Sequence, residues 1–331
     1  MSSQLALRTN TIGFWLGVGW LLLILSSGLL ASWLPLSFAP AVPDLLHVAE
    51  APAWAASPTH WLGTDPQGRD VLTELVYGAR QVVSISLPAA ILATLVGALA
   101  GGAAGFWGNS GLRLPWASWL AGAAASWWGL ALPGRWAVSL SLTGLAGLSW
   151  WINRRSPTAK PSGWPLPLDS IFQSTLTLLG AVPRLVLVLV FAAGPALGTS
   201  QVVALLVLVA WPEPARQVRA QMLRVRELPF VEAAWAAGLP PTRVWYRHAL
   251  PHACRPLLTL APLSLAGLIG LESTLAFLGV GRPPDVPSWG NLLGTLQQEP
   301  GAWWVLTSAG GALVLTLVAL QQLARQLVKR Q

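Results

Sequence analysis

The chain has 331 residues, of which 54% are hydrophobic and only 10% are charged. A soluble domain is about 25% charged, so this composition excludes an ordinary soluble protein and predicts an integral membrane protein. The formal net charge of +8 would suit nucleic acid, but the basic residues lie in particular loops, as membrane topology requires, and we expect no nucleic-acid partner. The 20 Trp suit bilayer interfaces, and the single cysteine, Cys254, excludes an intramolecular disulfide and a cysteine-based metal cage.

The N-terminal part predicts one span followed by an external segment. Residues Thr11 to Leu34 form an apolar run of about 24 residues, which is long enough to cross a bilayer. A cleaved signal peptide is the alternative, but its apolar part would be shorter, about 7–15 residues, and a proline-rich stretch follows here from Pro35. Residues 35–80 are acid-rich and poor in bases, which indicates a position outside the cytoplasm. Within them, Asp70 is placed to cap a helix that runs into the membrane.

Two apolar stretches follow this segment. Val82 to Trp107 is a second span, and its many glycines predict close packing against other helices. Residues 109–168 contain two shorter apolar runs, Trp116 to Pro133 and Trp136 to Trp151. Each run covers about 25 Å, which is marginal against a hydrocarbon core of about 30 Å. We predict a thin transmembrane hairpin with both ends in the cytoplasm; a hairpin that only dips into the bilayer is the alternative.

The C-terminal half predicts four more spans. The region from Arg216 to Arg255 is rich in arginine and has few acids, which is typical of a cytoplasmic loop, and basic residues also close the chain. The spans are Ile171 to Ala193, Ser200 to Arg216, Leu257 to Gly279 and Trp303 to Leu323. In total we predict an all-α polytopic membrane bundle of about eight spans in the plasma membrane, with both termini cytoplasmic.

A polar stretch from Phe230 to Leu258 interrupts these spans. It predicts a short helix that stops at Gly238, a restart at two prolines, and a second short helix that ends at Pro251. Its spacing is E-A-A-x-x-x-G, then nine residues, then H-A-L-P, carried by Glu232, Ala233, Ala234, Gly238, His248, Leu250 and Pro251. Two short helices joined by a tight turn can seat in a groove on a partner and move with it as a rigid body.

This spacing resembles the coupling loop of ABC importer permeases, in the form found in the dipeptide/oligopeptide/nickel permease family. Two external blocks and the segment LESTLAFLGVG resemble the same family. The resemblance covers about residues 60–108 and 168–325 and is to the second permease type, which carries the external G-T-D block. It implies six family-like spans, to which the hairpin is an addition. The external blocks contain Gly63, Thr64, Asp65, Gly68, Arg69, Asp70, Pro287, Ser288, Trp289 and Gly290.

The resemblance implies a permease subunit of an ATP-driven importer for peptides or a related small solute in the bacterial inner membrane. The expected partners are a second permease subunit that completes a heterodimer, two ABC ATPase subunits, an external solute-binding protein and membrane lipid. The chain lacks a G-x-x-x-x-G-K-[ST] loop, so ATP hydrolysis is expected in a partner; we expect no enzyme activity and no cofactor here. The alternatives are a nickel or metal-chelate importer, and a membrane scaffold or enzyme whose basic loop binds lipid.

The resemblance also predicts the division of the chain. Residues 1–80 hold the first span and the external segment, and residues 81–325 form the permease domain. That domain contains the inserted hairpin, 109–168, and the cytoplasmic coupling loop, 224–256. Residues 326–331 form a cytoplasmic tail.

Some charged residues do not fit a simple apolar bundle. Glu272 lies inside an apolar span and is predicted to line the pathway; a hydrogen bond between helices or a position near the interface is the alternative. Arg184 and Glu213-Pro214 depart from the family pattern; Arg184 could pair with Glu272, but snorkelling to the cytoplasmic face is simpler. His60 is predicted on the opposite side of the membrane from His248 and His252, which excludes a metal site shared by all three.

Overall fold

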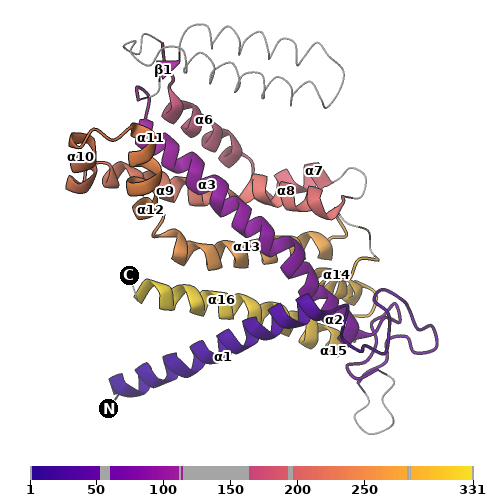
Figure 1. Cartoon of the computed structure of the whole chain (residues 1–331). Helices are drawn as coiled ribbons and strands as arrows, with labels where there is room; N and C mark the ends of the chain where they lie inside the picture. The colour runs from indigo at the N-terminus through magenta and orange to yellow at the C-terminus, as the bar shows by residue number, and fades with distance from the viewer. Residues whose placement is uncertain are drawn as a thin grey trace, which may run out of the picture. The chain divides into compact units, whose positions relative to one another are not determined.

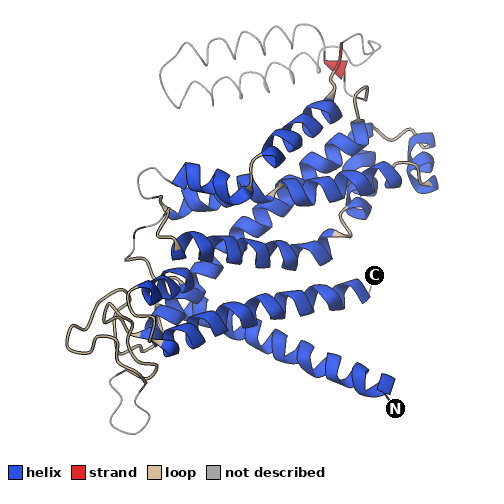
Figure 2. Cartoon of the chain, turned by 180° about the vertical axis from the view of Figure 1, so that it is seen from behind, coloured by secondary structure: helices blue, strands red, loops and turns tan. Residues whose placement is uncertain are grey.

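The structure, a computed structural model, describes residues 2–52, 60–111, 113–114, 164–192, 197–281, 283 and 285–329. The described elements are almost all helices, as Figure 2 shows. The chain forms two compact units: Met1–Gly102 with Thr177–Gln331, and Ala103–Leu176. The predicted all-α class is therefore confirmed, with one minor exception in the second unit.

The long helices of the first unit are its candidates for crossing a membrane. Four described stretches are long and apolar enough to cross a membrane, or up to five if a bent pair counts as one span. They are Gly13–Leu30, Val71–Trp107, Leu257–Phe277 and Trp303–Lys329. The predicted total of eight is not confirmed, and the predicted hairpin runs between 116 and 151 lie outside the described residues.

The helix after the first loop begins at Val71, directly after the predicted cap Asp70, and includes the predicted span Val82 to Trp107. It comprises α2 (Val71–Gln81), a π-helical turn η1 (Val82–Ser86) and α3 (Leu87–Trp107). Asp70 caps it as predicted, since its carboxylate accepts from the Thr73 amide at 2.8 Å. The π turn precedes Pro88, and the Leu87 amide donates to the Val82 carbonyl. Because proline cannot donate and crowds the preceding turn, this wider turn lets the helix continue.

The predicted span from Ile171 to Ala193 is not one straight helix. It consists of α6 (Leu168–Ala181) and α7 (Arg184–Ala192), and the two axes are bent by 82°. The break lies at Val182-Pro183, because the residue before a proline is disfavoured in the α region. The next predicted span, Ser200 to Arg216, is α8 (Thr199–Ala210) followed by the first turn of α9 (Pro212–Val225).

The remaining helices are short, apart from α13 (Leu257–Phe277) and the helices at the two ends of the chain. The first helix is α1 (Ser2–Leu30), and the last is α16 (Gly311–Lys329). Between them lie α10 (Pro229–Ala236), α11 (Pro241–Arg243), η2 (Val244–Ala249), α12 (Leu250–Ala253), α13 (Leu257–Phe277), α14 (Trp289–Gly294), η3 (Thr295–Gln297), α15 (Trp303–Val305) and η4 (Leu306–Gly310).

The core of the first unit forms where α16 packs against both α1 and α13 (Figure 1). Trp20 donates from Nε1 to Thr316 Oγ1 at 3.0 Å, which joins α1 to α16. The predicted close packing of the glycine-rich helix is confirmed: a Cβ at Gly97 would lie 2.8 Å from the Trp211 carbonyl oxygen, and one at Gly101 would collide with the backbone of Ala215. Figure 1 shows both termini and α10–α12 at one end of this unit, and α14, α15 and the loop after α1 at the other.

The second unit brings together residues near the two ends of the predicted insertion, 109–168. Two-residue strands β1 (Arg113–Leu114) and β2 (Trp164–Pro165) pair antiparallel, with Arg113 opposite Pro165. The Asn109 side chain bridges to Ser170, donating to its hydroxyl and accepting from its amide, each at 2.9 Å. The two ends of the insertion are therefore held together.

Candidate functional site

The first arm of the predicted coupling loop is α10, and its end is defined by backbone hydrogen bonds. We call residues 229–253 the elbow. The Gly238 amide donates to the Trp235 carbonyl at 2.9 Å, and the Leu239 amide donates to the Ala234 carbonyl at 3.3 Å. This pair is a Schellman motif, which needs a left-handed residue after the helix, and Gly238 has φ +74°. The predicted stop at Gly238 is confirmed.

The second arm continues further than predicted. Pro240 lies in the extended region, and helical backbone then runs from Pro241 to Ala253, so the prediction that Pro251 ends the helix is wrong. The π turn η2 lies just before this proline, and the Leu250 amide donates to the Trp245 carbonyl. As at Pro88, the wider turn lets the helix continue although proline has no backbone N–H to donate.

The elbow turns one side inward and leaves the other open. Val231 and Ala234, three residues apart, are buried on α10, and Val244, Ala249 and Ala253 are buried on the second arm. Phe230 and His252 pack their rings 4.7 Å apart, which holds the arms together. The residues on the open side are Glu232, Ala233, Trp235, Gly238, Arg243, Tyr246 and Arg247. Of the remaining predicted residues, His248 and Leu250 are half-buried and Pro251 is exposed.

The inner side of the elbow contacts the glycine-rich helix. A Cβ at Gly102 would lie 2.6 Å from Leu250 Cδ1, and 3.6 Å from both Met222 Cε of α9 and Trp245 Nε1. α12 also contacts α9 directly. A displacement of the elbow would therefore be passed to α3 and α9 through close contacts.

The first predicted external block is a folded loop. Asp65 accepts from the amides of Gln67 and Arg69 at 2.9 and 2.8 Å, and from Arg69 Nε at 2.8 Å. Asp65 is fully buried and Arg69 is 4% exposed. Gly68, with φ +79°, makes the turn between them. We call residues 35–70 the loop segment; the polar groups of Asp65 and Arg69 stabilise its own structure.

The two predicted external blocks meet. Trp289 donates from Nε1 to the Leu75 carbonyl at 3.0 Å, and its ring covers Gly78 so closely that a Cβ there would collide with it. Trp304 donates to the Thr64 carbonyl at 2.9 Å. Ser288 caps α14 by accepting from the Asn291 amide at 3.1 Å. The remaining residues of the blocks also have structural positions: Gly63 has φ +77°, Pro287 is buried, and a Cβ at Gly290 would collide with the Ser273 carbonyl.

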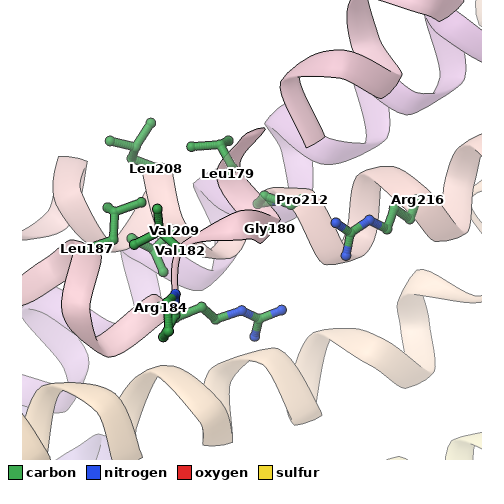
Figure 3. Close-up of a pocket in the computed structure, with 10 residues that line it drawn as sticks. Leu179, Gly180, Val182, Arg184, Leu187, Leu208, Val209, Pro212 and Arg216 are labelled. Carbon is green, nitrogen blue, oxygen red and sulfur yellow. The ribbon is translucent and has the colours of Figure 1, made fainter. Parts of the chain in front are cut away.

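A groove lies where the chain bends at Pro183. One cavity of about 290 Å³ is lined by Leu179, Leu187, Leu208 and other residues, among which Arg184 and Arg216 are charged (Figure 3). A second cavity, of about 270 Å³, shares Arg184 and Val209 and extends along α13. We call the two together the bend groove. Arg184 Nη2 lies 3.6 Å from Glu213 Oε2, so the described ion pair of Arg184 is with Glu213 and not with Glu272.

Glu272 lies on α13 and is 6% exposed. It borders a small cavity of about 20 Å³ with Val202 of α8 and Asn291 of α14. It is five residues before the end of α13, or about 8 Å along the axis from that end. It therefore lies near the end of the unit that holds the loop segment.

Comparison of this sequence with known proteins shows the family to which the chain belongs. Residues 159–330 match the family described as "Binding-protein-dependent transport system inner membrane component". A protein of Brucella suis biovar 1 named "Putative peptide permease protein" is 30% identical over 294 residues, which are 87% of this chain and 76% of that protein. The chain belongs to this family. A peptidoglycan transport system permease protein of Agrobacterium fabrum is 28% identical over 246 residues, or 74% of this chain and 50% of that protein.

The predicted membership of the ABC importer permeases of the peptide family is therefore confirmed, as is a multi-pass inner-membrane permease. This family of binding-protein-dependent transport implies a substrate-binding protein and an ATPase as partners. Two features of this permease were missed in the sequence. The pairing of Arg184 with Glu213 joins two positions that were each noted separately as unusual. The proximity of Asp44, His47 and His60 was not foreseen either, although the D-x-x-H spacing of the first two was a signal.

Proposed function

We propose that this permease forms half of a translocation path for peptides and takes its driving motion from an ATPase through the elbow. The observation that carries the proposal is the open side of the elbow, where small and aromatic side chains are exposed on a rigid, Schellman-capped pair of helices. Trp235 is 44% exposed and Tyr246 is 54% exposed. Exposed aromatic side chains beside arginines are typical of protein interfaces.

The route of the motion follows from the contacts behind the elbow. Closure of two ATPase subunits would push α10, and α10 would move with the second arm because its buried side packs on it. Leu250 and Trp245 would then press on α3 at Gly102, which has no side chain of its own at this contact. Packed helices shift as rigid bodies, so the motion would reach the bend groove through α9, which carries Glu213.

We propose the bend groove and the open face of α13 as this subunit's share of the path. A Cβ at Gly267 or Gly270 would meet no atom within 4 Å, so the described residues leave this face of α13 uncovered. A second permease subunit would cover it. The paired charges of Arg184 and Glu213 would lie beside a passing peptide, and Glu272 would lie nearer the external end of the path.

The orientation is proposed from charge. The elbow and both termini lie at the end that holds the arginine-rich loop, which favours the cytoplasm for that end. The loop segment would then be external, where a solute-binding protein docks. We also propose the division into residues 1–80, 81–325 and 326–331, with 109–168 as an insertion. The names of the relatives support a peptide as the solute over nickel or a metal chelate.

The proposal is tested by assembly and transport. The permease is co-expressed with its second permease subunit and ATPase subunits, purified, and reconstituted in liposomes with the binding protein. We expect the ATPase to co-purify with the wild-type chain, and deletion of residues 232–250 to abolish both co-purification and peptide uptake. Full coupling after this deletion would overturn the proposal.

A further inference from the structure

Three side chains of the loop segment bring metal-binding atoms together. Asp44, His47 and His60 each offer one ligand atom, and these atoms lie within 4.8 Å of one another. Asp44 and His47 are half-buried and His60 is buried, so the surrounding protein partly encloses the cluster. None of these three residues belongs to the elbow or to the bend groove. Imidazole and carboxylate together suit zinc, copper and nickel ions.

The distances suit a tetrahedral ion. Asp44 Oδ2 lies 2.9 Å from His47 Nδ1 and 3.4 Å from His60 Nε2. Ligand bonds of about 2.0–2.1 Å at tetrahedral angles place neighbouring ligand atoms about 3.3 Å apart. Two of the three distances between ligand atoms are therefore near the tetrahedral value, and the third pair, His47 and His60, lies within 4.8 Å. The contact with His47 holds the pKa of Asp44 below its usual value and raises that of His47.

The orientation of His60 is the second observation. Its Nδ1 lies 3.0 Å from Asp70 Oδ1, and its ring stacks on Phe38 with centroids 4.1 Å apart. When Nδ1–H donates to Asp70, the lone pair of Nε2 points at the carboxylate of Asp44. A carboxylate behind a metal-binding imidazole is the usual arrangement in protein metal sites.

We propose that Asp44, His47 and His60 bind one divalent transition-metal ion of the zinc class, with water in the remaining position. Asp70 is a positioning residue, because it orients His60 and at the same time caps α2. The ion would join residues 44–47 to residue 60 and fix the loop segment to the start of the helix that enters the membrane. The ion is a structural clip and not the transported solute.

The test uses the purified full-length chain, without an affinity tag and stripped with a chelator. Co²⁺ is titrated and followed by its visible absorption, and Zn²⁺ is then added in competition. We expect one ion per chain, displacement of Co²⁺ by Zn²⁺, and a rise in the melting temperature with Zn²⁺. His47→Gln should weaken binding at least 10-fold. Asp70→Asn should weaken it about 10–100-fold while the Asn side chain keeps the helix cap.

The matched control is His252→Gln, which removes a histidine from the elbow and should bind Co²⁺ as the wild type does. Gel filtration of each variant checks that the fold is retained. His60 is left unchanged because it is buried. Three results would each overturn the proposal: no binding of one Co²⁺ per chain, binding by His47→Gln as tight as that of the wild type, or loss of binding in the control. Failure of peptide transport with intact metal binding would count against the proposed function and not against this site.

Discussion

The elbow and the loop segment both contain residues of the motifs predicted from the sequence, yet these residues have opposite environments in the two regions. In the loop segment the charged groups are buried and satisfied: Asp65 is 0% exposed, Arg69 4% and Asp70 7%. In the elbow Glu232, Arg243 and Arg247 are exposed, and the buried residues are only small or apolar. A motif residue can therefore serve the fold of its own chain or leave a surface for another chain. Burial and hydrogen bonding distinguish the two.

The largest expected effect is in the loop segment. Asp65→Ala removes the carboxylate that accepts from two backbone amides and from the buried Arg69 guanidinium. Because breaking a buried ion pair leaves a charge without its partner, we expect a loss of about 3–5 kcal/mol in stability. Thermal unfolding of the purified chain in detergent measures it. An unchanged melting temperature would show that this pair does not stabilise the loop segment.

A smaller loss of stability is expected at the turn of the elbow. Gly238→Ala places a Cβ on a residue with φ +74°, which costs about 1–2 kcal/mol locally. Because no other described atom lies within 4 Å of that Cβ, the cost is one of backbone strain and not of a clash. Gly238→Asn is the matched control, since asparagine tolerates this conformation better. We expect peptide uptake to fall in the alanine variant and to be largely kept in the asparagine variant; equal uptake would refute the role of the turn.

The open side of the elbow should show almost no loss of stability and a large loss of function. Ala233→Phe adds bulk at an exposed position, so unfolding should change by no more than about 0.5 kcal/mol. If Ala233 lies against an ATPase, uptake should fall at least 10-fold. Gln298→Phe, at an exposed position near the other end of the unit, should leave uptake unchanged. Similar uptake in both variants would mean that this face has no partner.

In the bend groove we also expect only a small effect on stability, together with a change in which peptides are transported. The Arg184–Glu213 pair is 3.6 Å apart with both side chains more than 40% exposed, so each neutral variant should change stability by less than about 1 kcal/mol. Arg184→Gln and Glu213→Gln are compared in uptake of peptides that differ in net charge. We expect the two variants to shift the charge preference in opposite directions. Identical preference in both would place the pair outside the path.

Local patterns predicted the elements, and long-range contacts escaped prediction. Asp70 as a cap and Gly238 as a stop were predictable, because each depends on a few neighbouring residues. Pro251 was misjudged because a π turn compensates for the missing amide, and sequence carries no sign of that turn. The 82° bend at Pro183 was hidden within a continuous apolar run. The pairing of Arg184 with Glu213 and the approach of His60 to Asp44 depend on folding of the whole unit.

The central claim is that the open side of the elbow contacts an ATPase, and site-specific cross-linking tests it most directly. Cys254 is the single cysteine, so Cys254→Ser gives a background in which Ala233→Cys or Gln298→Cys is introduced alone. Each variant is assembled with the other permease and the ATPase subunits and treated with a short thiol-to-amine cross-linker, with and without ATP. We predict a cross-link to the ATPase from position 233, changed by ATP, and none from position 298. No cross-link from 233, or an equal one from both positions, would contradict the account.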